Sequence, residues 1–81
     1  MNSGPVKHSL SLRGHRTSVS LEDVFWRAFQ QAAKEEGLAI NALAAHIDEG
    51  RDPEIGLASA IRVWLFEREM AKWEPLTAGA K

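Results

Sequence analysis

Three polar side chains, Arg16, Ser18 and Ser20, stand at every second position of one short segment. A guanidinium and two hydroxyls are groups that can reach base edges or phosphates in a groove of DNA. The positions between them are β-branched or apolar: Thr17, Val19 and Leu21. This alternation is the period-two pattern of a half-buried β-strand, so we expect one polar face and one packed face.

Such a strand needs a partner. A lone strand followed by helices cannot satisfy its own backbone N–H and C=O groups, and the simplest partner is the same strand in a second copy. The chain has 81 residues and no cysteine, so it has neither disulfides nor thiolate zinc sites to stabilise a small core. Oligomerisation is the common remaining solution, and we therefore expect a homodimer.

A second candidate strand lies just before the first, at residues 6–13. In one continuous strand, Leu10 and Leu12 would lie on the polar face, so the chain must change face near Gly14. A bulge there leaves residues 6–13 as an arm, whereas a two-residue type II′ turn beginning at Gly14 makes a hairpin that pairs Leu10 with Val19. The hairpin would also add Ser9, Ser11 and Arg13 to the polar face. We prefer the arm, because a hairpin would widen the sheet beyond the two strands that a major groove admits.

The rest of the chain predicts three helices. Ser20 is a possible N-cap for the first, whose apolar residues recur with helical period until Gly37. The second runs over residues 39–49 and stops at Gly50, and Asp52-Pro53 opens a third over residues 53–72. We expect an N-terminal arm, partly disordered, over residues 1–13, a domain over residues 14–72 and a flexible tail over residues 73–81.

The third helix is apolar over more than one face. Its apolar residues are Ile55, Leu57, Ala60, Ile61, Val63, Trp64, Leu65, Phe66 and Met70. A helix of this kind requires contacts on two sides, one with its own domain and one with a second subunit or another protein.

Charge is distributed unevenly along the chain. The formal net charge is −1, from 10 basic and 11 acidic residues. Residues 1–20 carry Lys7, Arg13 and Arg16 and no acid, so the positive end of the chain is the predicted strand. Arg13 and His15 therefore join the candidate DNA contacts, because positive charge attracts the phosphate backbone.

Several other functions have no support in the sequence. The three histidines do not share the spacing of metal ligands, so we expect no metal and no cofactor. The chain shows no nucleophile–base pairing and no phosphate-binding glycine loop, which argues against an enzyme. It also lacks a signal peptide and an apolar run of membrane-spanning length, so we expect a cytoplasmic protein with no membrane contact.

The order of strand, helix, glycine break and second helix resembles the ribbon-helix-helix family of Arc- and MetJ-like DNA-binding proteins. Residues 16–21 look like the family's ribbon, and residues 37–41 look like its turn between helices. The run Gly14 to Glu22, followed by Phe25 and Trp26, is more narrowly similar to a small bacterial subgroup of that family. This narrower resemblance extends through the third helix.

The resemblance implies a mainly α fold with one short β ribbon, built as an intertwined homodimer with an extra C-terminal helix. The intermolecular antiparallel two-stranded ribbon would enter the major groove of double-stranded DNA. By position, Arg16, Ser18 and Ser20 match the outward, base-reading residues. The expected dimer core comprises Thr17, Val19, Leu21, Phe25, Phe29, Leu43 and Ile47.

The resemblance also implies a phosphate anchor at the start of the second helix, at Ala39, Ile40 and Asn41, where unpaired N–H groups favour an anion. The family commonly has a hydroxyl residue where this chain has Ala39. The expected function is that of a dimeric DNA-binding transcriptional regulator. The alternative is a protein-interaction or dimerisation module, including an antitoxin-like one, that keeps the fold, binds DNA weakly or not at all and uses the third helix to bind a protein partner.

Overall fold

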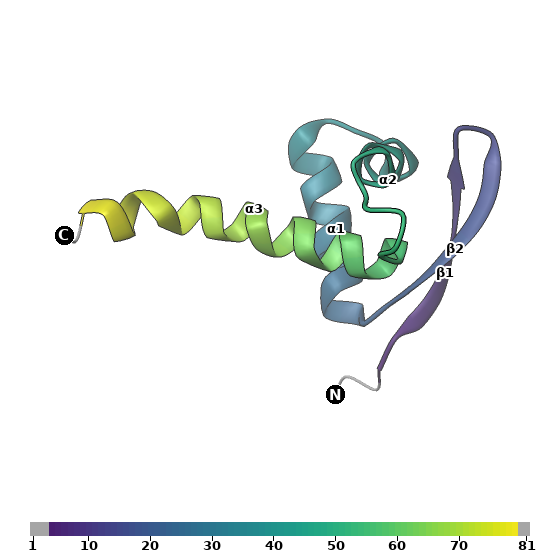
Figure 1. The fold of residues 1–81 in the computed structure, drawn as a ribbon, viewed down its shortest axis with the longest axis horizontal. Coiled ribbons are helices and arrows are strands. Elements are labelled where there is room, and N and C mark those ends of the chain that lie inside the picture. Colours follow the sequence, from purple (N-terminus) through teal and green to yellow (C-terminus); the bar gives the residue numbers. More distant parts are fainter. Residues whose placement is uncertain (1–3, 80–81) are drawn as a thin grey trace.

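The structure, a computed structural model, describes residues 4–79, with side chains as far as Trp73. The elements follow the order β1 (Val6–Leu12), β2 (His15–Leu21), α1 (Asp23–Glu36), α2 (Ile40–Glu49) and α3 (Leu57–Gly79). The two strands form one antiparallel sheet, and the three helices lie on one side of it (Figure 1). The expected mainly α fold with a short ribbon and an added third helix is confirmed.

β1 and β2 form a hairpin within one chain, so the expectation of an arm over residues 6–13 is wrong. The turn residues are Arg13 and Gly14, whose φ angles of 50° and 83° are both positive, as a type I′ turn requires. The turn therefore begins one residue earlier than in the type II′ alternative, and Leu10 pairs with Thr17 rather than with Val19.

Burial explains why β1 docks as a strand. Leu10 and Leu12 are only 3% and 8% exposed on the inner face of the sheet. His8, in the same strand, stacks on Trp26 of α1 with 3.8 Å between ring centroids. An arm would leave these side chains in water, so the hairpin gains apolar burial and β2 finds its first partner in its own chain.

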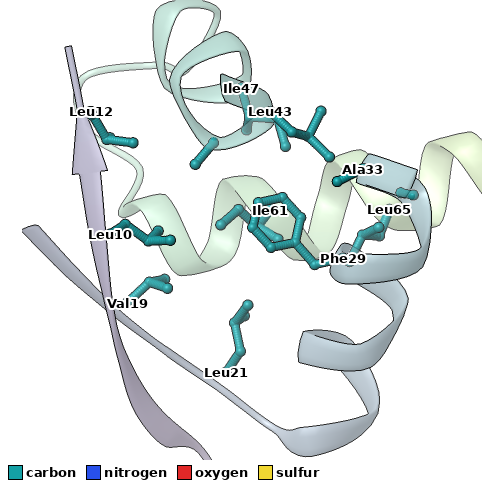
Figure 2. Packing of buried hydrophobic residues seen from close by; sticks show 12 residues of the cluster. Leu10, Leu12, Val19, Leu21, Phe29, Ala33, Leu43, Ile47, Ile61 and Leu65 are labelled. Atoms are coloured by element: carbon teal, nitrogen blue, oxygen red, sulfur yellow. The ribbon is translucent and has the colours of Figure 1, made fainter. Parts of the chain in front are cut away.

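The core lies between the inner face of the hairpin and the three helices (Figure 2). Its buried residues are Leu10, Leu12, Val19, Leu21, Phe29, Ala32, Ala33, Leu43, Ala44, Ile47, Ile61 and Leu65. Five members of the expected dimer core are among them, whereas Thr17 and Phe25 are half-buried. The five buried residues are at most 6% exposed within a single chain, so they belong to the core of the protomer itself.

The first helix begins later than predicted. Glu22 occupies the N-cap position of α1 without a side-chain cap, and Ser20 belongs to β2, so the expected Ser20 cap is wrong. The helix ends as predicted at Gly37, with φ of 70°. The N–H of Gly37 donates to the Lys34 carbonyl and that of Leu38 to the Ala33 carbonyl, which is the Schellman arrangement.

The third helix starts at Leu57 instead of Pro53. The Asp52 carboxylate accepts the N–H of Glu54 at 2.9 Å, and the Asp52 carbonyl accepts the N–H of Ile55 at 2.9 Å. These two bonds close a turn, and α3 follows it, with the Ala60 N–H donating to the Gly56 carbonyl.

The tail expected to be flexible from Trp73 is helical as far as Gly79, while Ala80 and Lys81 lie outside the described residues. α3 consequently projects far beyond the body of the protein, away from the hairpin (Figure 1). No helix among the described residues is long and apolar enough to cross a membrane.

Candidate nucleic-acid interface

The outer face of the hairpin carries six exposed polar residues. The antiparallel register places Lys7 opposite Ser20, Ser9 opposite Ser18, and Ser11 opposite Arg16. Side chains alternate between faces along each strand, so all six lie on the side away from the buried leucines. This outer face therefore presents two cations and four hydroxyls, with no carboxylate among its own residues.

Three of the predicted DNA contacts lie together on this face: Arg16, Ser18 and Ser20. Each is exposed, and Ser20 does not cap α1, so its hydroxyl is available for other contacts. The prediction of DNA contacts did not include Lys7, Ser9 and Ser11. Ser9 and Ser11 alternate with Leu10 and Leu12, and this pattern could have identified them as outer-face residues. They were left out because residues 6–13 were expected to form an arm and not a strand of the hairpin.

Arg13 points elsewhere. It occupies the turn, and its guanidinium donates to Asp48 at 2.9 Å and to Glu49 at 2.8 Å, near the C-terminus of α2. The Arg13 charge is therefore neutralised by two carboxylates and joins the hairpin tip to the helix. His15, also a predicted contact, is exposed and lies opposite Leu12, off the outer face.

The predicted phosphate anchor at the start of α2 lies beside β1. Ala39 is the N-cap residue and makes no side-chain cap, and the first helical bond runs from the Leu43 N–H to the Ala39 carbonyl. The N–H groups of the first turn thus have no partner within the helix. The Asn41 side chain accepts the Ser11 N–H at 3.0 Å and Ile40 is half-buried, so these two side chains serve the contact with the hairpin and the core.

The two edges of the hairpin differ. The Asn41 bond occupies the outer edge of β1 at Ser11. In a hairpin with a two-residue turn, the residues that close the turn, here Leu12 and His15, hydrogen-bond to each other, and hydrogen-bonded pairs alternate with non-bonded pairs along the strands. The backbone N–H and C=O groups of Arg16, Ser18 and Ser20, which belong to non-bonded pairs, therefore point to the outer edge of β2. No side chain among the described residues hydrogen-bonds to that edge, which leaves it able to pair with another strand.

An ion pair fixes the end of β2 against α3. Both Nε and Nη2 of Arg62 donate to Oε1 of Glu22, at 3.0 and 2.8 Å. These hydrogen bonds from Arg62 hold the pKa of the Glu22 carboxyl below its usual value. The first acidic residue after the hairpin is therefore paired with a cation of the same chain.

A separate cavity of about 680 Å³ lies between α2 and α3 and contains no hairpin residue. Its apolar lining includes Ile55, Val63 and Trp64. The described part of the chain contains no group of three His, Asp or Glu side chains that could hold a metal ion. The chemistry that the outer face offers is therefore hydrogen bonding and positive charge.

Comparison with known protein families adds one match. A family model described as a ribbon-helix-helix domain matches residues 5–68, which include β1, the predicted ribbon and the first half of α3. No curated protein and no solved structure gives a significant match. Ribbon-helix-helix domains are generally DNA-binding folds of transcription regulators and are not enzymes. On the strength of this match and of the strand, helix and helix that it spans, the chain belongs to the ribbon-helix-helix domain family.

Proposed function

We propose that the protein is a dimeric DNA-binding regulator that places the outer face of its hairpin against duplex DNA. The observation that carries this proposal is the composition of that face. Lys7 and Arg16 supply positive charge, the four serines supply hydrogen-bonding groups, and no acid lies among them. Cations contribute most of the affinity for a phosphate backbone, while side chains that reach base edges contribute specificity.

The dimer in this proposal forms through the open edge of β2. The register that pairs all of His15–Leu21 with the same strand of a second copy places Ser18 opposite the second Ser18 and Arg16 opposite Ser20. The result is a four-stranded antiparallel sheet with the two β2 strands at its centre. This arrangement keeps the expected pairing of the ribbon strands and adds a β1 strand on each side.

The width of this sheet determines how it meets DNA. Four strands spaced about 4.8 Å apart exceed what a groove about 12 Å wide admits. The central β2 strands therefore approach the bases, with Arg16 as the one side chain capable of bidentate contact with guanine. The flanking β1 strands bring Lys7 and its neighbouring serines to the phosphates on either side. We expect modest sequence specificity, because hydroxyls discriminate among bases less sharply than guanidinium groups do.

Binding to duplex DNA, measured by fluorescence anisotropy over a range of salt concentrations, tests the proposal. In non-specific binding, where the cations contact phosphates rather than base edges, Lys7 and Arg16 from both chains would neutralise four phosphates, so the slope of log K against log[salt] should be about −3.6. Arg16→Ala removes two of these contacts and should reduce the slope to about −1.8.

Arg13→Ala is the matched control. It removes the same charge, but from a guanidinium already paired with Asp48 and Glu49, so the salt slope should stay near that of the wild-type protein. Absence of binding at low salt contradicts the proposal. Equal loss of slope in Arg13→Ala and Arg16→Ala contradicts the assignment of the outer face as the contact surface.

The alternative, a protein-interaction module of the antitoxin-like or another kind, is favoured by one observation: large apolar side chains on α3 are exposed. It predicts no DNA binding in the same titration.

A further inference from the structure

One line of apolar side chains on α3 is exposed. Val63, Phe66 and Met70 are 54%, 64% and 53% exposed, and Trp73, at 58%, continues the same spacing. Steps of three, four and three residues are those of positions a and d in a coiled coil, which form a narrow apolar seam along one side of a helix. We call Val63, Phe66 and Met70 the α3 seam.

The α3 seam lies on the side of α3 that faces away from α1, and its first residue, Val63, also lines the cavity between α2 and α3. Ile61 and Leu65 are buried in the core, and Arg68 donates to Glu35 at 2.7 Å and to Glu36 on α1. In the heptad that places Val63 at position a, these three residues occupy positions c and f, on the other side of the helix. Packing against α1 therefore leaves the α3 seam facing outward.

We propose that the α3 seam packs against the same seam of a second copy, with the two α3 helices parallel and in register. An a/d seam is complementary to an identical seam, because each of its side chains fits between those of the facing helix. This inference rests on the β2-paired dimer of the proposed function and adds a second contact between the same two chains.

The geometry of the hairpin supports the parallel orientation. An antiparallel pair of identical strands is related by a twofold axis perpendicular to the sheet. α3 leaves the sheet and runs away from it (Figure 1). Rotation about such an axis therefore sends both α3 helices in the same direction.

The charges beside the α3 seam favour the same orientation. Arg62 and Glu67 occupy the flanking g and e positions, which face each other across a parallel pair. Arg62 uses Nε and Nη2 to bind Glu22, so its Nη1 is the group directed to Glu67 of the second copy. An antiparallel pair centred on the seam would instead bring each Glu67 near the other and each Glu69 near the other, which repel.

The size of the α3 seam fits a supporting contact. A stable interface buries about 800 Å² on each partner, which a few side chains do not supply alone. Together with seven paired residues of β2, the α3 seam extends the dimer contact from the sheet to the projecting half of α3. The partner of the α3 seam is therefore the same second copy that pairs at β2.

The chain has no cysteine, so single-cysteine variants report contacts between chains without background. Met70→Cys should form a disulfide with itself under mild oxidation, seen as a dimer on a non-reducing gel, because a parallel pair places position 70 opposite position 70. Lys72→Cys is the control: it is also exposed but lies off the seam, and it should stay monomeric on the gel. Cross-linking of Phe66→Cys only to Met70→Cys in a mixture would indicate an antiparallel pair and overturn the inference.

A second pair of variants tests the contact between the two α3 helices without cross-linking. Phe66→Glu should raise the dimer dissociation constant, measured by sedimentation, by roughly tenfold or more, because it places a charge in an apolar contact. Ala71→Glu adds the same charge on an exposed position outside the seam and should leave the constant unchanged. Both positions are exposed in the protomer, so unchanged circular dichroism should verify the fold. Equal effects of the two variants would overturn the inference.

Ser18→Cys separates this inference from the proposed function, since Ser18 faces Ser18 in the β2 register. If Ser18→Cys forms a disulfide and Met70→Cys does not, the α3 inference is overturned while the β2 dimer stands. If Met70→Cys cross-links and Ser18→Cys does not, the α3 contact is supported and the β2 pairing is refuted. DNA titration of the reduced Met70→Cys protein, whose substitution lies away from the outer face of the hairpin, then reports the proposed function independently.

Discussion

Replacing Leu10 by alanine tests whether β1 is a structural strand of the domain. Leu10 is 3% exposed between the hairpin and the helices, so the substitution removes a buried side chain and leaves a cavity (Figure 2). Such changes cost about 2 to 5 kcal/mol. A chain of 81 residues has an expected stability of about 4 to 12 kcal/mol, so a large part of it would be lost.

Urea unfolding followed by circular dichroism, at one fixed protein concentration, measures this loss. For an m-value near 1.5 kcal/mol/M, a loss of about 2 to 5 kcal/mol lowers the midpoint by roughly 1.3 to 3.3 M. Ser9→Ala is the control, because Ser9 is exposed on the opposite face of the same strand, and its effect should be within about 0.5 kcal/mol. A Leu10→Ala protein as stable as the Ser9→Ala protein would refute the docking of β1 on the core.

Two further predictions concern the turn and the ion pairs. Gly14→Ala should destabilise the protein by about 1 to 2 kcal/mol in the same urea assay, because φ is 83° there although no atom lies within 4 Å of an added Cβ. Hydrogen bonds from Arg62 and Arg68 lower the pKa of the Glu22 and Glu35 carboxyls from the ordinary value of 4.5. Their contribution to stability is therefore present above pH 4.5 and lost as the pH falls through the lowered pKa values, and Glu22→Gln should reduce the drop in urea midpoint between pH 7 and pH 3.

The elements that sequence reasoning placed correctly are those set by local chemistry. Gly37 ends α1 because the left-handed conformation there costs glycine little, and the apolar period of residues 21–33 matches the face that α1 buries. The start of α3 was misplaced because Asp52 and Pro53 fit a helix N-terminus and a turn equally well. The Asp52 carboxylate accepts the Glu54 N–H in either case, so the backbone decides: the Asp52 carbonyl accepts the N–H of Ile55, three residues on, and the helical bonds of α3 begin at the Gly56 carbonyl.

The sequence could predict the residues of the candidate site where the alternation of polar and apolar residues alone determines which face of a strand they occupy. Arg16, Ser18 and Ser20 follow from the period of two, and β2 carries them outward as expected. The position of Arg13 was not predictable, because it depends on which residues form the turn. A turn at Arg13 and Gly14 brings the guanidinium to Asp48 and Glu49, which lie 35 and 36 residues away in the sequence.

The hairpin also changes how folding and dimerisation are related. A ribbon strand whose only partner lies in another chain can satisfy its backbone only after association, so its folding requires dimerisation. Here β1 pairs with β2 in the same chain and contributes Leu10 and Leu12 to a core that is complete within one protomer. The open edge of β2 and the exposed α3 seam then lie outside that core. In the proposed dimer, variants on these two surfaces should therefore change the association of two copies without unfolding the protomer, so their effects on binding can be interpreted.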